Sequence, residues 1–522
     1  MKYTFYNRKM IFMRAKFTQY KYPLLAILIH IMVSILRCFY AVYGPLRLQG
    51  DEAQFWAWSK HLDWSYYSKP PLIAYCNYIT QQWFGHSELS VKINAILCGM
   101  LIGWITYLFT YKVYQSHLKA YWASMLVLVM PFYVEISFFY STDSILLLFW
   151  LLSAYFYWQA STTNKWQYWL ALGLCIGIGS LGKYAMLFFI VTLLLYLLSK
   201  ERKQLSNPAL YAALSLSFTI FIPVVIWNMN HQFIGYQHLE HLSGLHDTQY
   251  SPLKKIVNVV RFIGGQLALV SPLFVGMYYK MFKKNWHQRI TQYFFIPMFF
   301  IWIIFIIVSL IKKHEADINW TMFVYAGLPI LLASYIVDYH KERVAKVLFA
   351  ITFLLLSLVS TIPTWNSLFS KKVLPVKSDP TTCLVNWKNA ANDVNEVYQK
   401  CSNPQKTFLF TDDYMLASEL MFYLYPNNQI YFFNNGSRMC EYQLWKGVEQ
   451  YDNKDYDAIF IDYSCIYDNP TAQLPMNIKS AFTRTDLHVR KIYYYRNEPY
   501  YQLDIYRLKE FKHLKPVPVS NY

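Results

Sequence analysis

The sequence predicts an α-helical membrane protein that crosses the bilayer many times and ends in a smaller soluble α/β domain. Hydrophobic residues make up 55% of its 522 positions and charged residues 15%, whereas a soluble domain carries about 25% charged residues. Apolar runs of spanning length recur through the first 365 positions. Beyond residue 366 they give way to short β-rich runs, which are typical of a soluble domain.

About eleven apolar segments are candidate transmembrane helices. The basic N-terminus precedes the first of them, and no small-residue cleavage site follows it, so we expect an uncleaved first span. The segments lie at roughly 22–43, 90–112, 119–139, 142–160, 168–181, 184–199, 209–228, 256–280, 290–311, 318–338 and 344–365.

The basic residues indicate how these segments are oriented. The net charge is +18, but Lys and Arg gather in short clusters in every second loop, as at 200–203. Cytoplasmic loops carry this excess. The charge therefore indicates orientation and argues against nucleic acid as a partner. We expect a cytoplasmic N-terminus and an external C-terminal region.

Two domains are expected. Residues 1–366 would form the transmembrane domain, with outer loops at 44–89 and 229–255, and residues 367–522 the α/β domain. In the latter, helices at about 383–400 and 413–424 lie between strands at 407–410, 429–433, 458–461, 489–494 and 501–506. An exported compartment would permit disulfides, and one arrangement pairs Cys383 with Cys401 and Cys440 with Cys465.

The first outer loop contains a dense group of ionisable residues. Asp51 and Glu52 follow the first apolar run, and Lys69 precedes a Pro-Pro pair. Such charges near a membrane are costly unless they are paired or used. Two short amphipathic pieces, 52–62 and 71–84, suit the interface. A solvated interfacial loop would account for the same residues.

Residues 168–199 form an unusual pair of short spans. One helix of this length would measure about 48 Å, too long for one crossing, and both flanks are basic. The segment is therefore expected to go out and back, turning at 179–184. Lys183 lies in this turn and needs an anionic partner or water, unless its side chain reaches the membrane surface.

Two further outer segments carry polar residues. The cluster 141–144 places Asp143 where a helix begins, so it is either a site residue or an N-terminal cap. The loop 229–255 is rich in histidine, and His238 and His241 share a helix face. No carboxylate or thiol completes a metal set there. No cofactor is predicted, and no pattern supports a divalent metal.

The charged residues of the outer side suit one type of chemistry. Lysines near the lipid boundary would bind the phosphate of a donor whose tail stays in the membrane, and carboxylates would deprotonate an acceptor. A membrane transporter, the alternative from another class, would place its charges at mid-membrane in repeated halves. No repeat is visible, so we favour an enzyme. The residues concerned are Asp51, Glu52, Lys69, Asp143 and Lys183.

Motifs along nearly the whole chain carry a family resemblance. They are 50–53, 68–72, 141–144, 177–184, 227–228 with 231–233, 313–314 with 319–320, 412–414, 417–420 and 438–445. On these motifs the chain resembles the GT-C glycosyltransferases of the protein O-mannosyltransferase and lipid A aminoarabinose transferase superfamily. It is most similar to bacterial members described as dolichyl-phosphate-mannose-protein mannosyltransferase-like.

The resemblance implies a GT-C fold and a sugar transfer, with inversion at the anomeric carbon, from a polyprenyl-phosphate donor. It implies the following roles: Asp51 as the base, Glu52 as its partner in the Asp-Glu pair, Asp143 as organiser of the site, Lys69 and Lys183 on the donor phosphate, and His231 and His314 in substrate binding.

The acceptor expected from the resemblance is lipid A or another lipopolysaccharide or glycolipid component. The reaction would take place at the periplasmic face of a bacterial inner membrane, among membrane lipids. Protein O-glycosylation is the alternative, because the family extends to both acceptors.

Overall fold

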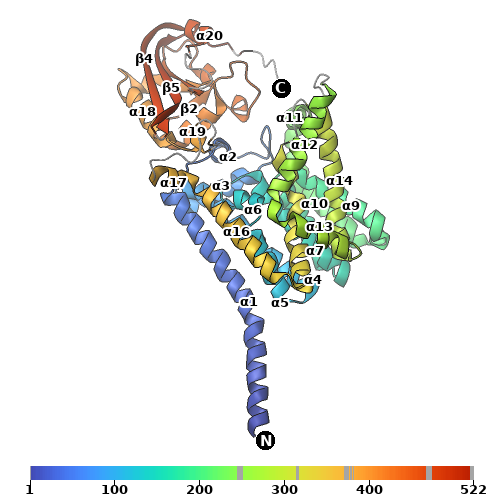
Figure 1. The fold of residues 1–522 in the computed structure, drawn as a ribbon. Coiled ribbons are helices and arrows are strands. Elements are labelled where there is room, and N and C mark those ends of the chain that lie inside the picture. The colour runs from blue at the N-terminus through green and yellow to red at the C-terminus, as the bar shows by residue number, and fades with distance from the viewer. Residues whose placement is uncertain are drawn as a thin grey trace. The chain divides into compact units, whose positions relative to one another are not determined.

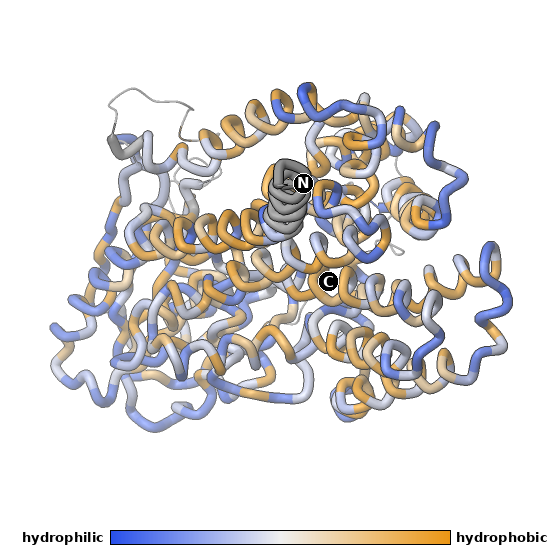
Figure 2. Tube along the Cα trace, turned by 90° about the horizontal axis from the view of Figure 1, so that it is seen from below, coloured by the Kyte–Doolittle hydropathy of each residue, from blue (hydrophilic) through white to orange (hydrophobic). Residues whose placement is uncertain are grey.

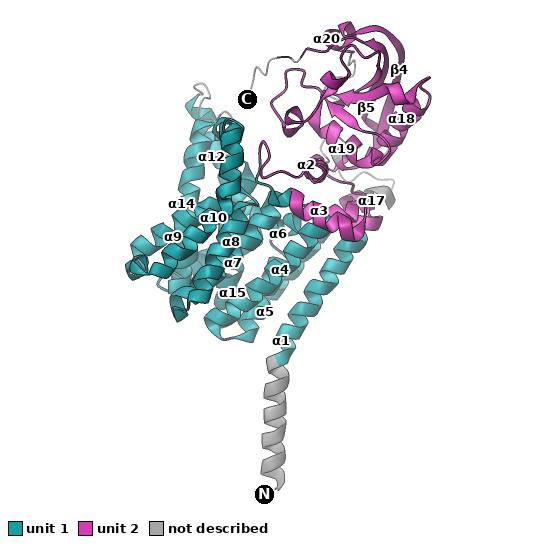
Figure 3. Cartoon of the chain, turned by 180° about the vertical axis from the view of Figure 1, so that it is seen from behind, with its two compact units in different colours: residues 1–40, 69–73, 92–359 teal, residues 41–68, 74–91, 360–522 magenta. Residues whose placement is uncertain are grey.

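The computed structural model describes residues 2–243, 251–312, 317–368, 376, 379, 381–465, 473–495, 497–515 and 517. The chain divides into two compact units (Figure 3). Unit 1 comprises residues 1–40, 69–73 and 92–359, and unit 2 comprises residues 41–68, 74–91 and 360–522.

Unit 1 is built from helices joined by short turns (Figure 1). Its core is a large cluster of apolar side chains, among them Phe132, Leu151 and Trp169, with a smaller cluster around Tyr107 and Met125. The helices are α1 (Lys2–Tyr43), α4 (Glu88–Tyr114), α5 (His117–Val127), α6 (Pro131–Ile136), α7 (Thr142–Thr163), α8 (Trp166–Ser180), η1 (Tyr184–Met186), α9 (Leu187–Lys200), η2 (Arg202–Ser206), α10 (Pro208–Asn230), α11 (Ile234–Ser243), α12 (Pro252–Leu269), η3 (Pro272–Phe274), α13 (Val275–Asn285), α14 (Arg289–Ile311), η4 (Ile318–Gly327), α15 (Leu328–Asp338) and α16 (Glu342–Ser360).

The protein is a multi-pass membrane protein, as the composition predicted. In the described part of the chain, seven helices are long and apolar enough to span a membrane, and α12 with η3 and α13 would make an eighth, bent by 84°. Apolar residues run along the helices, and hydrophilic residues gather at their connections (Figure 2).

Fewer helices of full spanning length are found than the eleven segments expected from hydropathy. The expected span 119–139 is divided, because Pro131 begins α6 as a separate helix after α5 ends. The segments 168–181 and 184–199 do form two helices joined by a turn, as predicted. These helices, α8 and α9, have 15 and 14 residues. A straight span needs about 20 residues, so both are too short for one.

Unit 2 contains a mixed five-stranded sheet in the order β2-β1-β3-β5-β4. The parallel strands are β1 (Thr407–Thr411), β2 (Ile430–Phe432) and β3 (Asp457–Cys465), and the antiparallel ones β4 (Phe482–Tyr495) and β5 (Glu498–Phe511). All five coincide with the expected β-rich runs, so the α/β class is confirmed. Its helical elements are α17 (Ile362–Leu368), η6 (Thr382–Leu384), α18 (Trp387–Gln399), η7 (Pro404–Lys406), α19 (Tyr414–Leu424), η8 (Glu441–Leu444), η9 (Val448–Tyr451) and α20 (Met476–Ser480).

Most of the first loop folds with the C-terminal domain, whereas the sequence grouped it with the transmembrane domain. Its two helices are α2 (Gly50–Trp58) and α3 (Leu72–Phe84), close to the expected amphipathic pieces. The Trp56 indole lies 5.0 Å from the Phe422 ring of α19. The Tyr423 hydroxyl donates to Glu88, which also pairs with Arg47. These contacts bury aromatic side chains that hydropathy alone assigns to the interface.

The cysteines of unit 2 form neither of the expected disulfides. Cys401, Cys440 and Cys465 are free thiols. The Cys401 thiol donates to the Val397 carbonyl within its own helical turn, and that of Cys465 donates to the carbonyl of Tyr500 on the neighbouring strand. Both thiols therefore bind nearby backbone carbonyls and not the cysteines expected to pair with them.

Candidate functional site

Asp143 lies in the first turn of α7 without serving as its cap. Ser141 is the N-cap residue, and its hydroxyl accepts a hydrogen bond from the Asp143 amide at 3.2 Å. The capping interpretation of Asp143 is therefore wrong. The residue is buried, only 4% exposed, and its carboxylate lies at a helix N-terminus, where a negative charge is favoured.

Lys183 pairs with this carboxylate. Its ammonium donates to Asp143 Oδ1 at 2.7 Å, and the two side chains are 15% and 6% exposed. The expected anionic partner of Lys183 is thus found. The turn approaches α7 closely because Gly182 has no side chain: a Cβ there would lie 2.4 Å from Ile145 Cγ2.

Two residues near Asp143 were not identified from the sequence as site residues. The Asn319 amide donates to the second carboxylate oxygen, Oδ2, at 3.5 Å. Glu135 is exposed, and its carboxyl lies near enough to Asp143 to be repelled by that negative charge. The carboxyl forms no hydrogen bond or ion pair with another described residue. A carboxylate inside the apolar segment 119–139 is the signal that could have identified Glu135.

The Lys-Pro-Pro segment of unit 1 is hydrogen-bonded to the turn that contains Lys183. The Leu72 amide donates to the Leu181 carbonyl at 2.8 Å. Lys69 is three residues before Leu72, and Lys183 is two residues after Leu181. Two lysine-bearing segments that are more than a hundred residues apart in sequence are therefore held together by the backbone. Lys69 itself is half-buried.

Asp51 and Glu52 have different environments at the start of α2 in unit 2. Asp51 is exposed, whereas Glu52 is 1% exposed. Glu52 Oε2 accepts a hydrogen bond from the Gln49 amide at 3.0 Å and completes a capping box. Asp51 is therefore available to a substrate, and Glu52 stabilises the helix that presents it.

One side chain of the C-terminal domain, that of Tyr414, lies near Asp51 and binds a second, that of Arg438. The Arg438 guanidinium donates to the Tyr414 hydroxyl at 2.6 Å. Burial raises the pKa of Tyr414, the Arg438 charge opposes this, and the Asp51 charge adds to it. Both residues belong to motifs of the family resemblance, but that resemblance gave them no role. Tyr414 therefore contacts a basic group and lies near enough to an acidic one for that charge to affect its pKa.

The remaining candidates are the two histidines. His231 is at the end of α10, where its Nδ1 lies 2.8 Å from the Trp227 carbonyl and its ring stacks on the Trp227 indole. His314 lies outside the described residues. The described residues include no group of three or more His, Cys, Asp or Glu side chains arranged to hold a metal ion.

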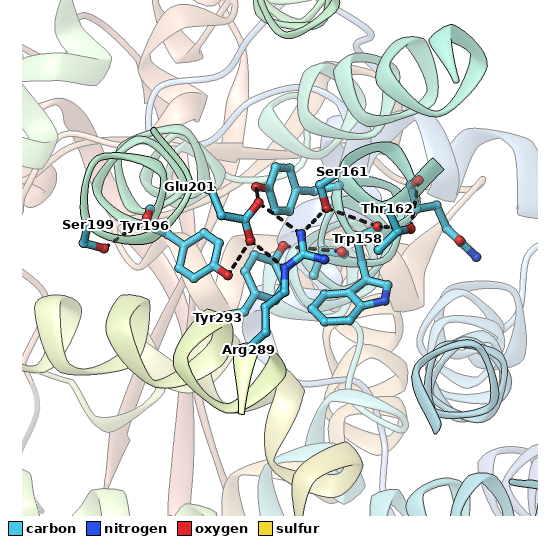
Figure 4. Close-up of polar contacts among 11 residues, drawn as sticks. Trp158, Ser161, Thr162, Tyr196, Ser199, Glu201, Arg289 and Tyr293 are labelled. Atoms are coloured by element: carbon cyan, nitrogen blue, oxygen red, sulfur yellow. Dashed lines mark hydrogen bonds and ion pairs between the residues drawn. The ribbon is translucent and has the colours of Figure 1, made fainter. Parts of the chain in front are cut away.

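A second ion pair lies at the other end of α7 (Figure 4). Arg289 donates to both oxygens of Glu201, at 2.7 and 3.0 Å, and to the Ser161 hydroxyl at 2.7 Å. The Tyr157 and Tyr196 hydroxyls donate to the same carboxylate at 2.7 and 2.6 Å. This cluster ties α7, α9 and α14 together.

Comparisons with known proteins agree with the family resemblance that the sequence motifs carry. The family described as dolichyl-phosphate-mannose-protein mannosyltransferase matches residues 68–227. The lipid A galacturonosyltransferase RgtD of Rhizobium johnstonii is 27% identical over 297 residues, 54% of this chain and 59% of RgtD. An undecaprenyl phosphate-alpha-4-amino-4-deoxy-L-arabinose arabinosyl transferase of Wigglesworthia glossinidia brevipalpis is 28% identical over 146 residues, 27% of this chain and 26% of that protein. The matched part of the chain thus spans little more than half of RgtD and about a quarter of the second relative.

Solved structures extend the similarity to most of the chain. The crystal structure of ArnT from Cupriavidus metallidurans in the apo state covers 92% of this chain and 97% of its own, at a TM-score of 0.63 and 14% identity. The same protein bound to undecaprenyl phosphate covers 91% and 97%, at a TM-score of 0.59 and 13% identity. The chain therefore has the GT-C glycosyltransferase fold in its ArnT-like form, which confirms the resemblance that the motifs predicted.

Proposed function

We propose that this protein is an inverting glycosyltransferase that moves a sugar from a polyprenyl-phosphate donor to lipid A or a related envelope glycolipid. The reaction would take place at the periplasmic face of a bacterial inner membrane. The observation that carries the proposal is the Lys183–Asp143 pair, which lies in a turn joined to the Lys69 segment. The lipid A galacturonosyltransferase and the aminoarabinose transferase among the relatives support the acceptor and the donor.

The lysines have the chemistry that a lipid-phosphate donor requires. An ammonium group has three donors, and the described contacts of Lys183 use one of them, on Asp143. The others are available to phosphate oxygens. In the transfer, the acceptor oxygen bonds to the anomeric carbon while the bond from that carbon to the phosphate oxygen breaks. Lys183 and Lys69 would stabilise the charge on the departing lipid phosphate.

The carboxylates would divide the remaining tasks. Asp51 is exposed and would accept the proton of an acceptor hydroxyl. Asp143 would hold Lys183 in place, and Glu52 would fix the start of α2. His231 and His314 would contact substrate. A phosphate acceptor is already anionic, and in that case Asp51 would position the acceptor without acting as a base.

Mass spectrometry of envelope glycolipids tests the proposal. We compare cells that have the gene, cells that lack it and cells that carry Asp51→Ala or Lys183→Ala. A sugar-sized mass is expected to disappear from lipid A in the deletion and in Lys183→Ala. Its loss in Asp51→Ala as well would indicate a hydroxyl acceptor, and its retention there would indicate a phosphate acceptor. An unchanged glycolipid profile in the deletion would contradict the proposal and direct the search to glycoproteins.

A further inference from the structure

Unit 2 contains a cavity of about 590 Å³. It lies between the C-terminal end of α2, the connection from α19 to β2, and the segment 442–450. Small-molecule sites in proteins commonly measure about 300–1,000 Å³. The cavity therefore has room for a ligand of the size of a short oligosaccharide, and none of the proposed roles of Asp51, Lys69 or Lys183 uses it.

Aromatic rings and amides share the wall of this cavity. Tyr425 is 42% exposed, and the half-buried Trp445 lies 4.1 Å from the His61 ring. The amide side chains of Asn428 and Gln450 belong to the same wall. Sugars present apolar C–H faces, which pack on aromatic rings, and hydroxyl groups, which exchange hydrogen bonds with amides. This combination suits a saccharide better than a purely apolar ligand.

The wall is also positively charged. It contains Lys60 and Lys446 and, among the described residues, neither aspartate nor glutamate. The Lys60 ammonium is held in place, 2.7 Å from Gln81 Oε1 and 4.4 Å above the Tyr425 ring. Lys446 is exposed and has no hydrogen bond or ion pair with a described residue. Burial lowers the pKa of Lys60, because its charge is poorly solvated there, and an anionic ligand would stabilise that charge.

We propose that this cavity binds an anionic saccharide, a phosphorylated or carboxylated sugar segment of the acceptor. The inference rests on the proposed function, because it assigns the segment to the acceptor. The helix α2 has Asp51 in its first turn and Trp56 at its other end, in the cavity wall. Its nine residues measure about 13 Å. An acceptor in the cavity would thus extend along α2 to Asp51.

Isothermal titration calorimetry on the full-length protein in nanodiscs, without donor, tests this binding. The probes are the phosphorylated oligosaccharide freed from lipopolysaccharide by deacylation, and the same oligosaccharide after phosphatase treatment. Lys446→Ala is expected to weaken binding of the phosphorylated probe roughly five- to tenfold and to leave that of the other probe unchanged. Trp445→Ala should weaken both. Lys479→Ala changes an exposed lysine outside the cavity and should change neither.

Two results would overturn the inference: no binding by the native protein, or equal affinities in the native protein and in both cavity variants. The proposed function is tested apart from this binding. If the affinities change as expected but no sugar is transferred from any polyprenyl-phosphate donor, the cavity assignment holds and the proposed function fails. If transfer occurs, Lys446→Ala should raise the KM for the acceptor and leave kcat unchanged. An unchanged KM would show that the cavity does not serve the acceptor.

Discussion

The two ends of α7 carry ion pairs of different kinds. At its C-terminal end each oxygen of Glu201 accepts two hydrogen bonds, one from Arg289 and one from a tyrosine. At its N-terminal end Asp143 has one short bond, from Lys183, and a long one from Asn319. The two ends lie about 27 Å apart, from the rise per residue between Asp143 and Ser161.

This difference in hydrogen bonding indicates a structural role for the Glu201 cluster and a chemical role for the Lys183–Asp143 pair. The Glu201 carboxylate is saturated, and the planar guanidinium of Arg289 matches it with two bonds. A substrate would have to break these contacts to bind there. Lys183 and Asp143 are more deeply buried, at 15% and 6% exposure against 38% and 15%, yet their hydrogen-bonding capacity is only partly used. Burial with spare donors is the arrangement expected of a site that binds an anion.

A buried carboxylate without a cation, that of Glu441, extends the comparison. We expect its substitution to have the largest effect, on the pH dependence of stability. Glu441 of unit 2 is 3% exposed and accepts a hydrogen bond from the Tyr67 amide at 2.6 Å. Burial raises its pKa to about 8. Between about pH 4.5 and 8 the folded state holds a proton that the unfolded state has lost, so stability falls as pH rises, by up to about 1.4 kcal/mol per pH unit. Glu441→Gln should flatten this slope.

Urea titration of the full-length protein from pH 5 to 9, with unit 2 followed by limited proteolysis, measures the slope. Glu449→Gln is the control, because Glu449 is exposed. Equal slopes in the native protein and in Glu441→Gln would show that Glu441 is charged throughout this range and that its hydrogen bonds from Tyr67 and Trp445 suffice to stabilise it.

The next largest effect is expected at the N-terminal end of α7. Lys183→Ala removes the spare donors, and loss of one preorganised donor to a developing charge lowers kcat by about 10²- to 10³-fold. Because loss of one partner from a buried pair costs about 3–5 kcal/mol, the variant is also expected to be less stable, and kcat is therefore compared per folded molecule. Single-turnover assays with a polyprenyl-phosphate sugar measure the loss. Lys165→Ala, an exposed lysine before α8, is the matched control, and similar rates in the two variants would refute the donor role of Lys183.

The sequence predicted some parts of this comparison and not others. Lys183 and Asp143 could be identified because charges in apolar surroundings stand out and because both lie in family motifs. That they pair with each other could not be predicted, since forty residues separate them and the contact depends on the close approach of Gly182 to Ile145.

The residues that the sequence did not reveal were missed for one reason: their contacts join segments that are distant in the chain. Glu201 lies in the basic cluster 200–203, which was interpreted as a cytoplasmic loop, and only the packing of α9 against α14 joins it to Arg289. The grouping of α2 with the C-terminal domain likewise depends on contacts between distant segments, as between Trp56 and Phe422. Periodicity and hydropathy locate elements, but they do not report which elements pack together.

The smallest effect is expected at the C-terminal end of α7, and it concerns stability alone. Arg289→Met leaves the Glu201 carboxylate with only its tyrosine partners. Loss of one partner from a buried pair costs about 3–5 kcal/mol. Because Arg289 is 38% exposed, we expect less, about 2–3 kcal/mol, measured by unfolding in SDS mixed micelles. Tyr196→Phe, which removes one hydrogen bond to the charged carboxylate, should cost about 1.5 kcal/mol. Activity per folded molecule should stay at the native level in both, since the cluster only braces the helices. A fall in kcat comparable to that of Lys183→Ala would mean that the two ends of α7 act as one unit.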